Sequence, residues 1–298
     1  MTGRNAGGDE RPRWRGPLQR WFGAVRRQLG RAGNSPAHEQ AEPRFQRSRA
    51  PVAVPAIVLT CDRYHPLTEH MIMRYDAEWP SHPFTFHVPY QEQRIEGTHI
   101  APRQTPKAIR ATVLELLDEF DSEAWVYWCI DDKYPIRLLQ PSVTQIAEAV
   151  VAEQLPWADG LIFCRCRKLL LSAHLRDETR KGPNGVVLLR RKDYSQFWIH
   201  QFLRVKVIRH VFQQFPESIP QAKGMDAMLS RIKLPDDHRL YVVETNLAVF
   251  GESTIRGRVS GNCAASLRSH GLGVPPAFEE TDARSFMGTI EAGGRGSG

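Results

Sequence analysis

The chain has 298 residues, 41% hydrophobic and 24% charged, an ordinary composition for a folded protein and not for a disordered one. No apolar run approaches the roughly 20 residues that a membrane-spanning helix needs, and the N-terminus lacks the apolar core of a signal peptide. The net charge of +7 comes from residues 1–50, where 11 arginines face 4 acidic residues, while the remaining 248 residues balance 29 basic with 29 acidic side chains. Nucleic-acid binding by the body of the chain is therefore not indicated.

The five cysteines are scattered and odd in number, which favours free thiols over a disulfide framework. A reducing compartment fits this pattern, and the absence of a signal peptide agrees with it. We therefore expect a cytoplasmic protein, with membrane association left open by the N-terminal arm.

Residues 1–50 form a basic arm that is rich in Arg, Gly and Pro, and most of it is expected to be disordered. Residues 13–31 differ, because apolar side chains recur there at helical spacing and arginines surround them. The apolar positions are Trp14, Leu18, Trp21, Phe22, Val25 and Leu29. This pattern is typical of an amphipathic helix that lies on a membrane surface. A helix that packs on the protein's own body and a disordered arm are equally open alternatives.

A folded body is predicted from residue 51 to residue 280, followed by a polar, Gly-rich and flexible tail at 281–298. Strands are predicted at 56–60, 84–88, 125–130, 160–165, 186–189 and 240–243, and helices at 67–79, 143–154, 195–215 and 222–232. Thr105 and Pro106 are a favourable helix start, and apolar residues between 109 and 120 give that helix one buried face. Alternating strands and helices in the first half predict an α/β fold with a mostly parallel central sheet flanked by helices. The second half is less regular.

The segment Trp125–Pro135 carries the strongest chemical signal, because a strand of aromatic and β-branched residues ends in two adjacent carboxylates, Asp131 and Asp132. Unpaired charges are rarely buried inside such a strand, but they are tolerated at its carboxyl end, where ligands of open α/β sheets bind. Two carboxylates at that place suit Mg²⁺ or Mn²⁺, and through the metal a diphosphate. Capping of a turn explains one of the two carboxylates better than it explains both.

The order of these motifs resembles the nucleotide-sugar glycosyltransferases of the GT-A fold over roughly residues 52–250. Ala56–Arg63 is similar to the first strand and nucleotide-binding loop of that family, Ile130–Lys133 to its acidic metal motif, and Gly224–Leu229 to its catalytic-base motif. The resemblance implies nucleotide-sugar contacts from Thr60, Asp62, Arg63 and Asp131, a metal bound by Asp131 and Asp132, and Asp226 as the base. The acidic motif departs from the family pattern, because Lys133 stands where a carboxylate is common. A less regular, acceptor-binding second half is implied as well.

Five further residues are candidates for substrate contact. Lys107 and Arg110 lie one helical turn apart before the acidic strand and are placed for phosphate or base contacts, with a solvated helix face as the alternative. Trp198 and His200, in a segment that mixes aromatic and hydrogen-bonding groups, and Glu252, in a Gly-containing loop, are candidate acceptor contacts. The alternatives are core roles for Trp198 and His200 and an ordinary surface loop around Glu252.

These inferences predict a metal-dependent, inverting glycosyltransferase that moves a sugar from a nucleoside-diphosphate donor to a glycan or lipid-linked acceptor. A nucleotidyltransferase of similar sheet architecture is the enzymatic alternative. A membrane-associated protein that binds a sugar or nucleotide without catalysis is the third reading, and the lysine in the acidic motif keeps it open.

Overall fold

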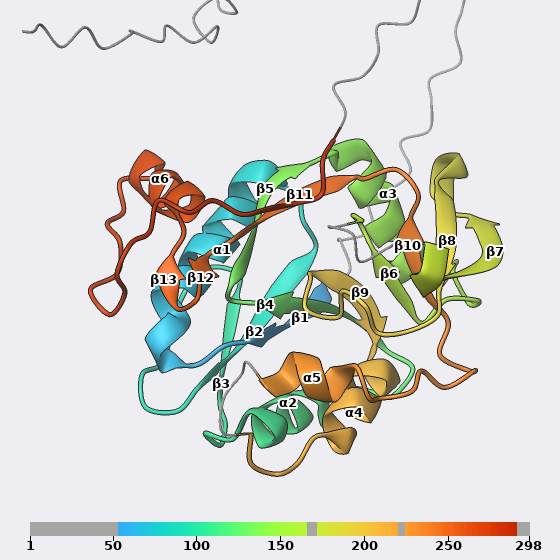
Figure 1. Cartoon of the computed structure of the whole chain (residues 1–298), viewed down its shortest axis with the longest axis horizontal. Coiled ribbons are helices and arrows are strands. Elements are labelled where there is room, and N and C mark those ends of the chain that lie inside the picture. Colours follow the sequence, from blue (N-terminus) through green and yellow to red (C-terminus); the bar gives the residue numbers. More distant parts are fainter. Residues whose placement is uncertain (1–52, 166–171, 220–223, 291–298) are drawn as a thin grey trace, which may run out of the picture. The chain divides into compact units, whose positions relative to one another are not determined.

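A computed structural model describes the chain in three stretches, residues 53–165, 172–219 and 224–290 (Figure 1). All of the described residues belong to one compact unit, Ser48–Gly298. The helix predicted at 13–31 lies outside the described residues and stays a prediction. Within the described stretches, no helix combines the length and the apolar character that crossing a bilayer requires.

This unit is built on a nine-stranded sheet with the order β3-β2-β1-β4-β9-β6-β10-β8-β7. Its strands are β1 (Val54–Leu59), β2 (Phe84–Tyr90), β3 (Ile100–Gln104), β4 (Trp125–Ile130), β6 (Gly160–Ile162), β7 (Leu175–Lys181), β8 (Val187–Arg191), β9 (Gln201–Arg204) and β10 (Leu240–Val243). Among these described strands, β8 and β9 run against the other seven. The prediction of an α/β fold with a mostly parallel central sheet is confirmed.

Two smaller antiparallel sheets accompany the large one. A three-stranded sheet pairs β5 (Lys133–Leu138) with β11 (Ala248–Glu252) and β11 with β14 (Phe286–Met287), and β12 (Thr254–Ile255) forms a hairpin with β13 (Arg258–Val259). The predicted flexible tail therefore begins too early, because β14 lies inside it and pairs with Phe250 and Gly251.

Helices cover both faces of the large sheet (Figure 1). They are α1 (His65–Glu78), α2 (Ile109–Leu117), α3 (Gln140–Val151), α4 (Val205–Gln214), α5 (Met225–Leu229) and α6 (Gly261–Ser269). Residues of α1, α3 and α6 share one hydrophobic cluster, and residues of α2, α4 and α5 share a second one.

Strand β4 lies between these two clusters, and this position explains why its residues are apolar. Tyr127 and Cys129 belong to the cluster with α1, whereas Val126 and Trp128 belong to the cluster with α2. All six of its residues are buried. A strand that is covered on both faces needs apolar side chains at every position, which is why the run is continuous and does not alternate.

Two predicted helices differ from the structure. The segment 195–215 contains β9, inserted antiparallel between β4 and β6, and helix α4 starts only at Val205. Its four strand residues are all buried, so no alternation marks it as a strand. The helix expected from Thr105 starts at Ile109, because the Thr105 N–H bonds the carbonyl of Tyr90 (3.0 Å) beyond the pairing of β2 and β3.

Candidate functional site

The acidic turn after β4 lies beside the end of β1, at the carboxyl edge of the parallel strands. The Asp131 N–H donates to the carbonyl of Leu59 (3.2 Å), and the Thr60 hydroxyl hydrogen-bonds the Asp131 carboxyl. Thr60 also contacts the Thr68 hydroxyl of α1 at 3.0 Å. The structure thus brings Thr60 and Asp131, both predicted to bind a nucleotide sugar, into direct contact.

The pKa of the Asp131 carboxyl is strongly shifted by its surroundings. Burial, and after it the neighbouring charge of Asp132, raise its pKa to about 8, although the Thr60 hydrogen bond and Lys133 act in the opposite direction. Without a further cation, the Asp131 carboxyl is therefore mostly protonated at pH 7. Such a group marks a place where added positive charge would be favourable.

Lys133 connects this turn to β11. Its side chain is only 8% exposed, and its Nζ lies 2.7 Å from Asp132 Oδ1 and 3.7 Å from Glu252 Oε1. Lys133 and Glu252 are direct partners in the pairing of β5 with β11, and the Ser253 N–H donates to the Asp132 carbonyl (2.6 Å). The turn and the end of β11 are therefore held together by both backbone and side-chain contacts.

His200 supports the turn from inside the protein and does not face a ligand. Its Nε2–H donates to the carbonyl of Ile130 (3.0 Å), and its Nδ1 accepts from the Tyr75 hydroxyl (2.7 Å), which also contacts the Tyr127 hydroxyl (2.9 Å). The side chain has no exposed surface, and burial lowers its pKa to about 3. The prediction that His200 contacts an acceptor is therefore wrong: its role is to fix the residue before Asp131.

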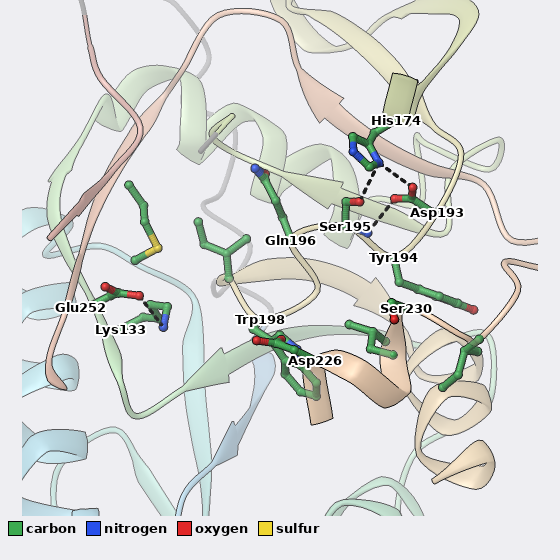
Figure 2. A pocket seen from close by; sticks show the side chains of 14 residues that line it. Lys133, His174, Asp193, Tyr194, Ser195, Gln196, Trp198, Asp226, Ser230 and Glu252 are labelled. Atoms are coloured by element: carbon green, nitrogen blue, oxygen red, sulfur yellow. Dashed lines mark hydrogen bonds and ion pairs between the residues drawn. The ribbon is translucent and has the colours of Figure 1, made fainter. Parts of the chain in front are cut away.

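A pocket of about 590 Å³ opens beside this turn, shown in Figure 2. Lys133 and Glu252 lie at one side of it, and Asp226 reaches it from the first turn of α5. Its apolar lining comes from Tyr194, Trp198, Ile199, Leu229, Ile232 and Met287. Three residues predicted from sequence, Trp198, Asp226 and Glu252, therefore line one cavity. The indole of Trp198 stacks on Phe215 at 6.3 Å, so one ring serves both the core and the pocket.

A polar group on the other side of the pocket was not predicted. His174 Nδ1 lies 2.7 Å from Asp193 Oδ2 and 3.1 Å from Ser195 Oγ, and the Ser195 N–H donates to Asp193 Oδ1 (Figure 2). Partial burial of Asp193 is outweighed by these hydrogen bonds, which lower its pKa. The carboxylate and the hydroxyl share one ring nitrogen, so this is not the relay of a serine hydrolase, in which they bind opposite nitrogens.

A strained residue and a buried arginine shape the wall that follows Ser195. Gln196 adopts a φ of +66°, which is uncommon for a residue other than glycine. Arg191 is fully buried and donates to the Ser195 carbonyl and to the Gln201 side chain. The left-handed backbone of Gln196 is a signal of a functional segment, but it can be seen only in the structure and not in the sequence.

The remaining predicted donor residues are mostly engaged in holding loops. Asp62 accepts backbone N–H groups from Gln91, Glu92 and Gln93 at 2.7–3.0 Å, and although burial acts against it, these donors lower its pKa. Lys107 is 77% exposed and pairs with Glu92 at 2.6 Å. Both therefore flank the loop at 91–93 beside the end of β1, and Asp62 is an anchor of that loop.

The two predicted arginines are fixed by protein groups as well. Arg63 donates to the carbonyl of Ala277 (3.0 Å) and its guanidinium lies 5.1 Å from the ring centre of Phe278. Arg110 donates to the carbonyl of Phe212 (3.2 Å), which ties α2 to α4. The structure does not bring either guanidinium to the acidic turn.

Asp76, His82 and His99 form a second group of potential metal ligands, with ligand atoms within 4.8 Å of one another. However, the Phe84 N–H donates to His82 Nδ1, so His82 carries its proton on Nε2 and donates it to Asp76 at 2.9 Å. A metal-binding histidine instead donates from its second ring nitrogen. Because the Nε2 proton of His82 is already given to Asp76, this group does not suit a metal.

Asp131 and Asp132 do suit a hard divalent cation. They offer carboxylate oxygens on consecutive residues, and Asp132 is 37% exposed. Lys133 places one ammonium group beside the carboxyl groups of Asp132 and Glu252, and its charge also acts on Asp131. Mg²⁺ and Mn²⁺ are the cations that prefer such oxygen donors.

No protein-family model and no curated protein matches this sequence. Similar solved structures include 2-C-methyl-D-erythritol 4-phosphate cytidylyltransferase from Thermus thermophilus, with 11% identity, a TM-score of 0.37, and coverage of 68% of this chain and 94% of that one. They also include galactosyltransferase LgtC in complex with donor and acceptor sugar analogs, with 12% identity, a TM-score of 0.32, and coverage of 62% and 68%. TM-scores this low carry no argument about activity, so function has to be inferred from the residues of this chain.

Proposed function

We propose that this protein is a glycosyltransferase that moves a sugar from a nucleoside-diphosphate donor to a hydroxyl group of an acceptor. The observation that carries this proposal is the link through Lys133 and Glu252 between the strand-end carboxylates and a pocket that contains a further carboxylate, Asp226. A donor site and an acceptor site that share a wall are what group transfer between two substrates requires.

The donor is proposed to lie over the ends of β1 and β4. Asp131 and Asp132 would hold Mn²⁺ or Mg²⁺, and that cation, when bound, stabilises negative charge on the departing diphosphate. Thr60 would hold Asp131 in place, and Asp62 keeps the loop at 91–93 against the end of β1, where Lys107 remains accessible for a phosphate or base contact.

The acceptor is proposed to bind in the pocket, with its reactive hydroxyl at Asp226. This carboxylate is exposed and has no ion-pair partner among the described residues, so it is able to accept the proton of the attacking hydroxyl. Attack from the pocket side with Asp226 as base would invert the anomeric centre. Trp198 would pack against the apolar face of an acceptor sugar, and Glu252 would accept a hydrogen bond from one of its hydroxyls.

The charge of the pocket favours this function over nucleotidyl transfer to a phosphate. Its lining includes the carboxylates Asp193, Asp226 and Glu252, while Lys133 already contacts Glu252 and the His174 imidazole contacts Asp193. An anionic phosphate nucleophile would be repelled there. A neutral hydroxyl acceptor would not be, and it needs a base.

The test is incubation of the full chain with a panel of nucleotide sugars, with and without Mn²⁺, while released nucleoside diphosphate and pyrophosphate are measured separately. We expect metal-dependent release of nucleoside diphosphate, with at least a tenfold loss in Asp132→Asn. Asp118→Asn is the matched control, because Asp118 is exposed and pairs with Arg209 away from the turn.

Each outcome of this assay distinguishes the readings. Pyrophosphate release would establish a nucleotidyltransferase instead. Binding of a nucleotide sugar without turnover, in the presence of Mn²⁺ and a broad acceptor panel, would favour a binding protein without catalysis. No binding of any nucleotide sugar would remove both proposals.

The arm is proposed to bring the enzyme to an anionic membrane through residues 13–31, where a lipid-linked acceptor would be presented. Its arginines and aromatic residues support this role. Deletion of residues 1–50 should abolish sedimentation with vesicles that contain phosphatidylserine. Equal sedimentation of both forms would contradict it.

A further inference from the structure

Lys133 lies where a metal-binding acidic motif would be expected to have a carboxylate, and its surroundings give it a specific role. Its side chain is 8% exposed, and its ammonium lies between Asp132 Oδ1 at 2.7 Å and Glu252 Oε1 at 3.7 Å. Because it is packed in the wall between β5 and β11, it cannot turn away into water as a surface lysine can. A fixed positive charge is therefore built into the site.

This charge competes with a divalent cation for Asp132. A metal bound through Asp132 would lie a few ångströms from the ammonium, and like charges at such a distance repel each other. A diphosphate would change this balance, because its negative charge would offset the repulsion between the metal and the ammonium. The bare turn is thus a weak metal site, and the turn with a diphosphate is a stronger one.

We propose that Lys133 is a positioning residue that keeps Asp132 paired in the free protein, so that the divalent cation binds together with the nucleoside diphosphate and not before it. This inference rests on the proposed function, since it assumes that the turn holds the metal of a nucleotide-sugar donor. It adds the order in which the components assemble and the residue that sets this order.

A second consequence follows from the contact with Glu252. When the metal and diphosphate draw Asp132 away, the ammonium is left to Glu252, which lines the acceptor pocket. Donor binding would then strengthen the ion pair in the pocket wall. The donor site and the acceptor site are coupled through one side chain.

The test compares the wild-type chain with Lys133→Met, Lys133→Arg and Lys181→Met. Lys181 is an exposed lysine at the end of β7, so its replacement makes the same charge change elsewhere. Mn²⁺ affinity of the protein alone is read from the electron paramagnetic resonance signal of free Mn²⁺. Because Mn²⁺ binds nucleotides in solution, the coupling is measured from the nucleotide side, as the affinity for ADP, CDP, GDP and UDP with and without Mn²⁺.

We expect weak Mn²⁺ binding by the wild-type protein alone, and at least tenfold tighter binding of one nucleoside diphosphate when Mn²⁺ is present. By thermodynamic linkage, the bound nucleotide raises the affinity for Mn²⁺ by the same factor. Lys133→Met should bind Mn²⁺ alone about 10–100-fold more tightly than wild type, the range typical of groups that surround metal ligands, and should lose most of the coupling. Lys133→Arg and Lys181→Met should behave as wild type.

Three results would overturn the inference. These are tight Mn²⁺ binding by the wild-type protein alone, nucleotide affinity that does not depend on Mn²⁺, and a Lys133→Met protein that matches Lys181→Met. If Lys133→Met does not fold, tight Mn²⁺ binding or absent coupling in the wild-type protein would still overturn the inference. Adding Asp131→Asn to Lys133→Met should abolish the new tight binding, and its persistence would place the metal elsewhere. Metal-dependent release of nucleoside diphosphate without coupling would remove this inference and leave the proposed function intact.

Discussion

The turn after β4 and the pocket beside it are built in opposite ways. The turn places its polar residues consecutively, at the end of a strand that is buried on both faces in the parallel part of the sheet. The pocket collects residues from separate segments, among them the reversed-strand region around β8 and β9, the short helix α5, and β11 and β14. The first arrangement holds charged groups at the end of a rigid strand, and the second leaves room for shape to vary. If the turn handles an invariant diphosphate and the pocket a specific acceptor, this difference is expected.

The largest expected effect separates the two regions. Asp226→Asn should lower transfer by about 10²–10⁴-fold, the usual contribution of a general base. Metal and nucleotide binding at the turn should stay unchanged, because α5 makes none of the contacts of the turn described above. Steady-state rates together with nucleotide titration measure both quantities. If Asp226→Asn also lowered the affinity for the nucleotide, the pocket and the turn would not serve separate functions.

Asp131→Asn should have two opposite consequences at the turn. Metal affinity should fall by about 10–100-fold, as for loss of a ligand or its support. The variant should be more stable than the wild type at pH 8. In the wild type, the folded pKa of Asp131 is raised from 3.8 to about 8, so the free energy of unfolding falls as pH rises between these values. Asparagine does not titrate and causes no such loss. We expect a gain of about 2 kcal/mol after allowance for solvent relaxation.

Thermal unfolding of both proteins at pH 5 and pH 8 checks the stability change in Asp131→Asn. The difference in favour of the variant should be larger at pH 8. A variant that is equally destabilised at both values would show that the Asp131 carboxyl is needed for folding and is not held for a cation.

His200 gives a smaller effect that belongs to the support of the turn. Its pKa is lowered to about 3 in the folded chain, so its contribution to stability is complete above the unfolded pKa near 6.5 and is lost as pH falls toward 3. Each pH unit below 6.5 should remove about 1.4 kcal/mol. Comparison of wild type with His200→Asn by urea unfolding should show their difference narrowing by about 3 kcal/mol between pH 6.5 and pH 4.5. A constant difference would mean that burial of the imidazole is not what matters.

The smallest effect is expected at Arg63, outside both regions. Arg63→Met should change transfer less than about threefold, because the guanidinium holds the Ala277 carbonyl and the Phe278 ring. A loss of nucleotide affinity above tenfold would return this residue to the donor site, as the sequence predicted.

A feature can be predicted from the sequence when the residues that form it are close together in the chain. The strand of β4 and its acidic end were predictable because a run that is buried on both faces leaves a continuous apolar pattern in adjacent residues. The meeting of His174 and Asp193 was not, because it depends on β7 and β8 forming a hairpin. Strand β9 was missed since its four buried residues lack alternation and lead directly into a helix. Asp62 could not be assigned from sequence, because a loop 29 residues away provides its partners.

The pairing of β14 with β11 has a practical consequence for anyone who purifies this protein. Met287 lines the pocket and belongs to the two-residue strand β14, in which Met287 pairs with Phe250 and Phe286 pairs with Gly251. Proteases that trim the chain before residue 286 would remove this wall, while the helices on both faces of the large sheet keep their contacts. Such material would elute and melt much like the intact protein but would handle acceptors differently. Intact mass measured before every acceptor assay is therefore the control that distinguishes a clipped preparation from an inactive enzyme.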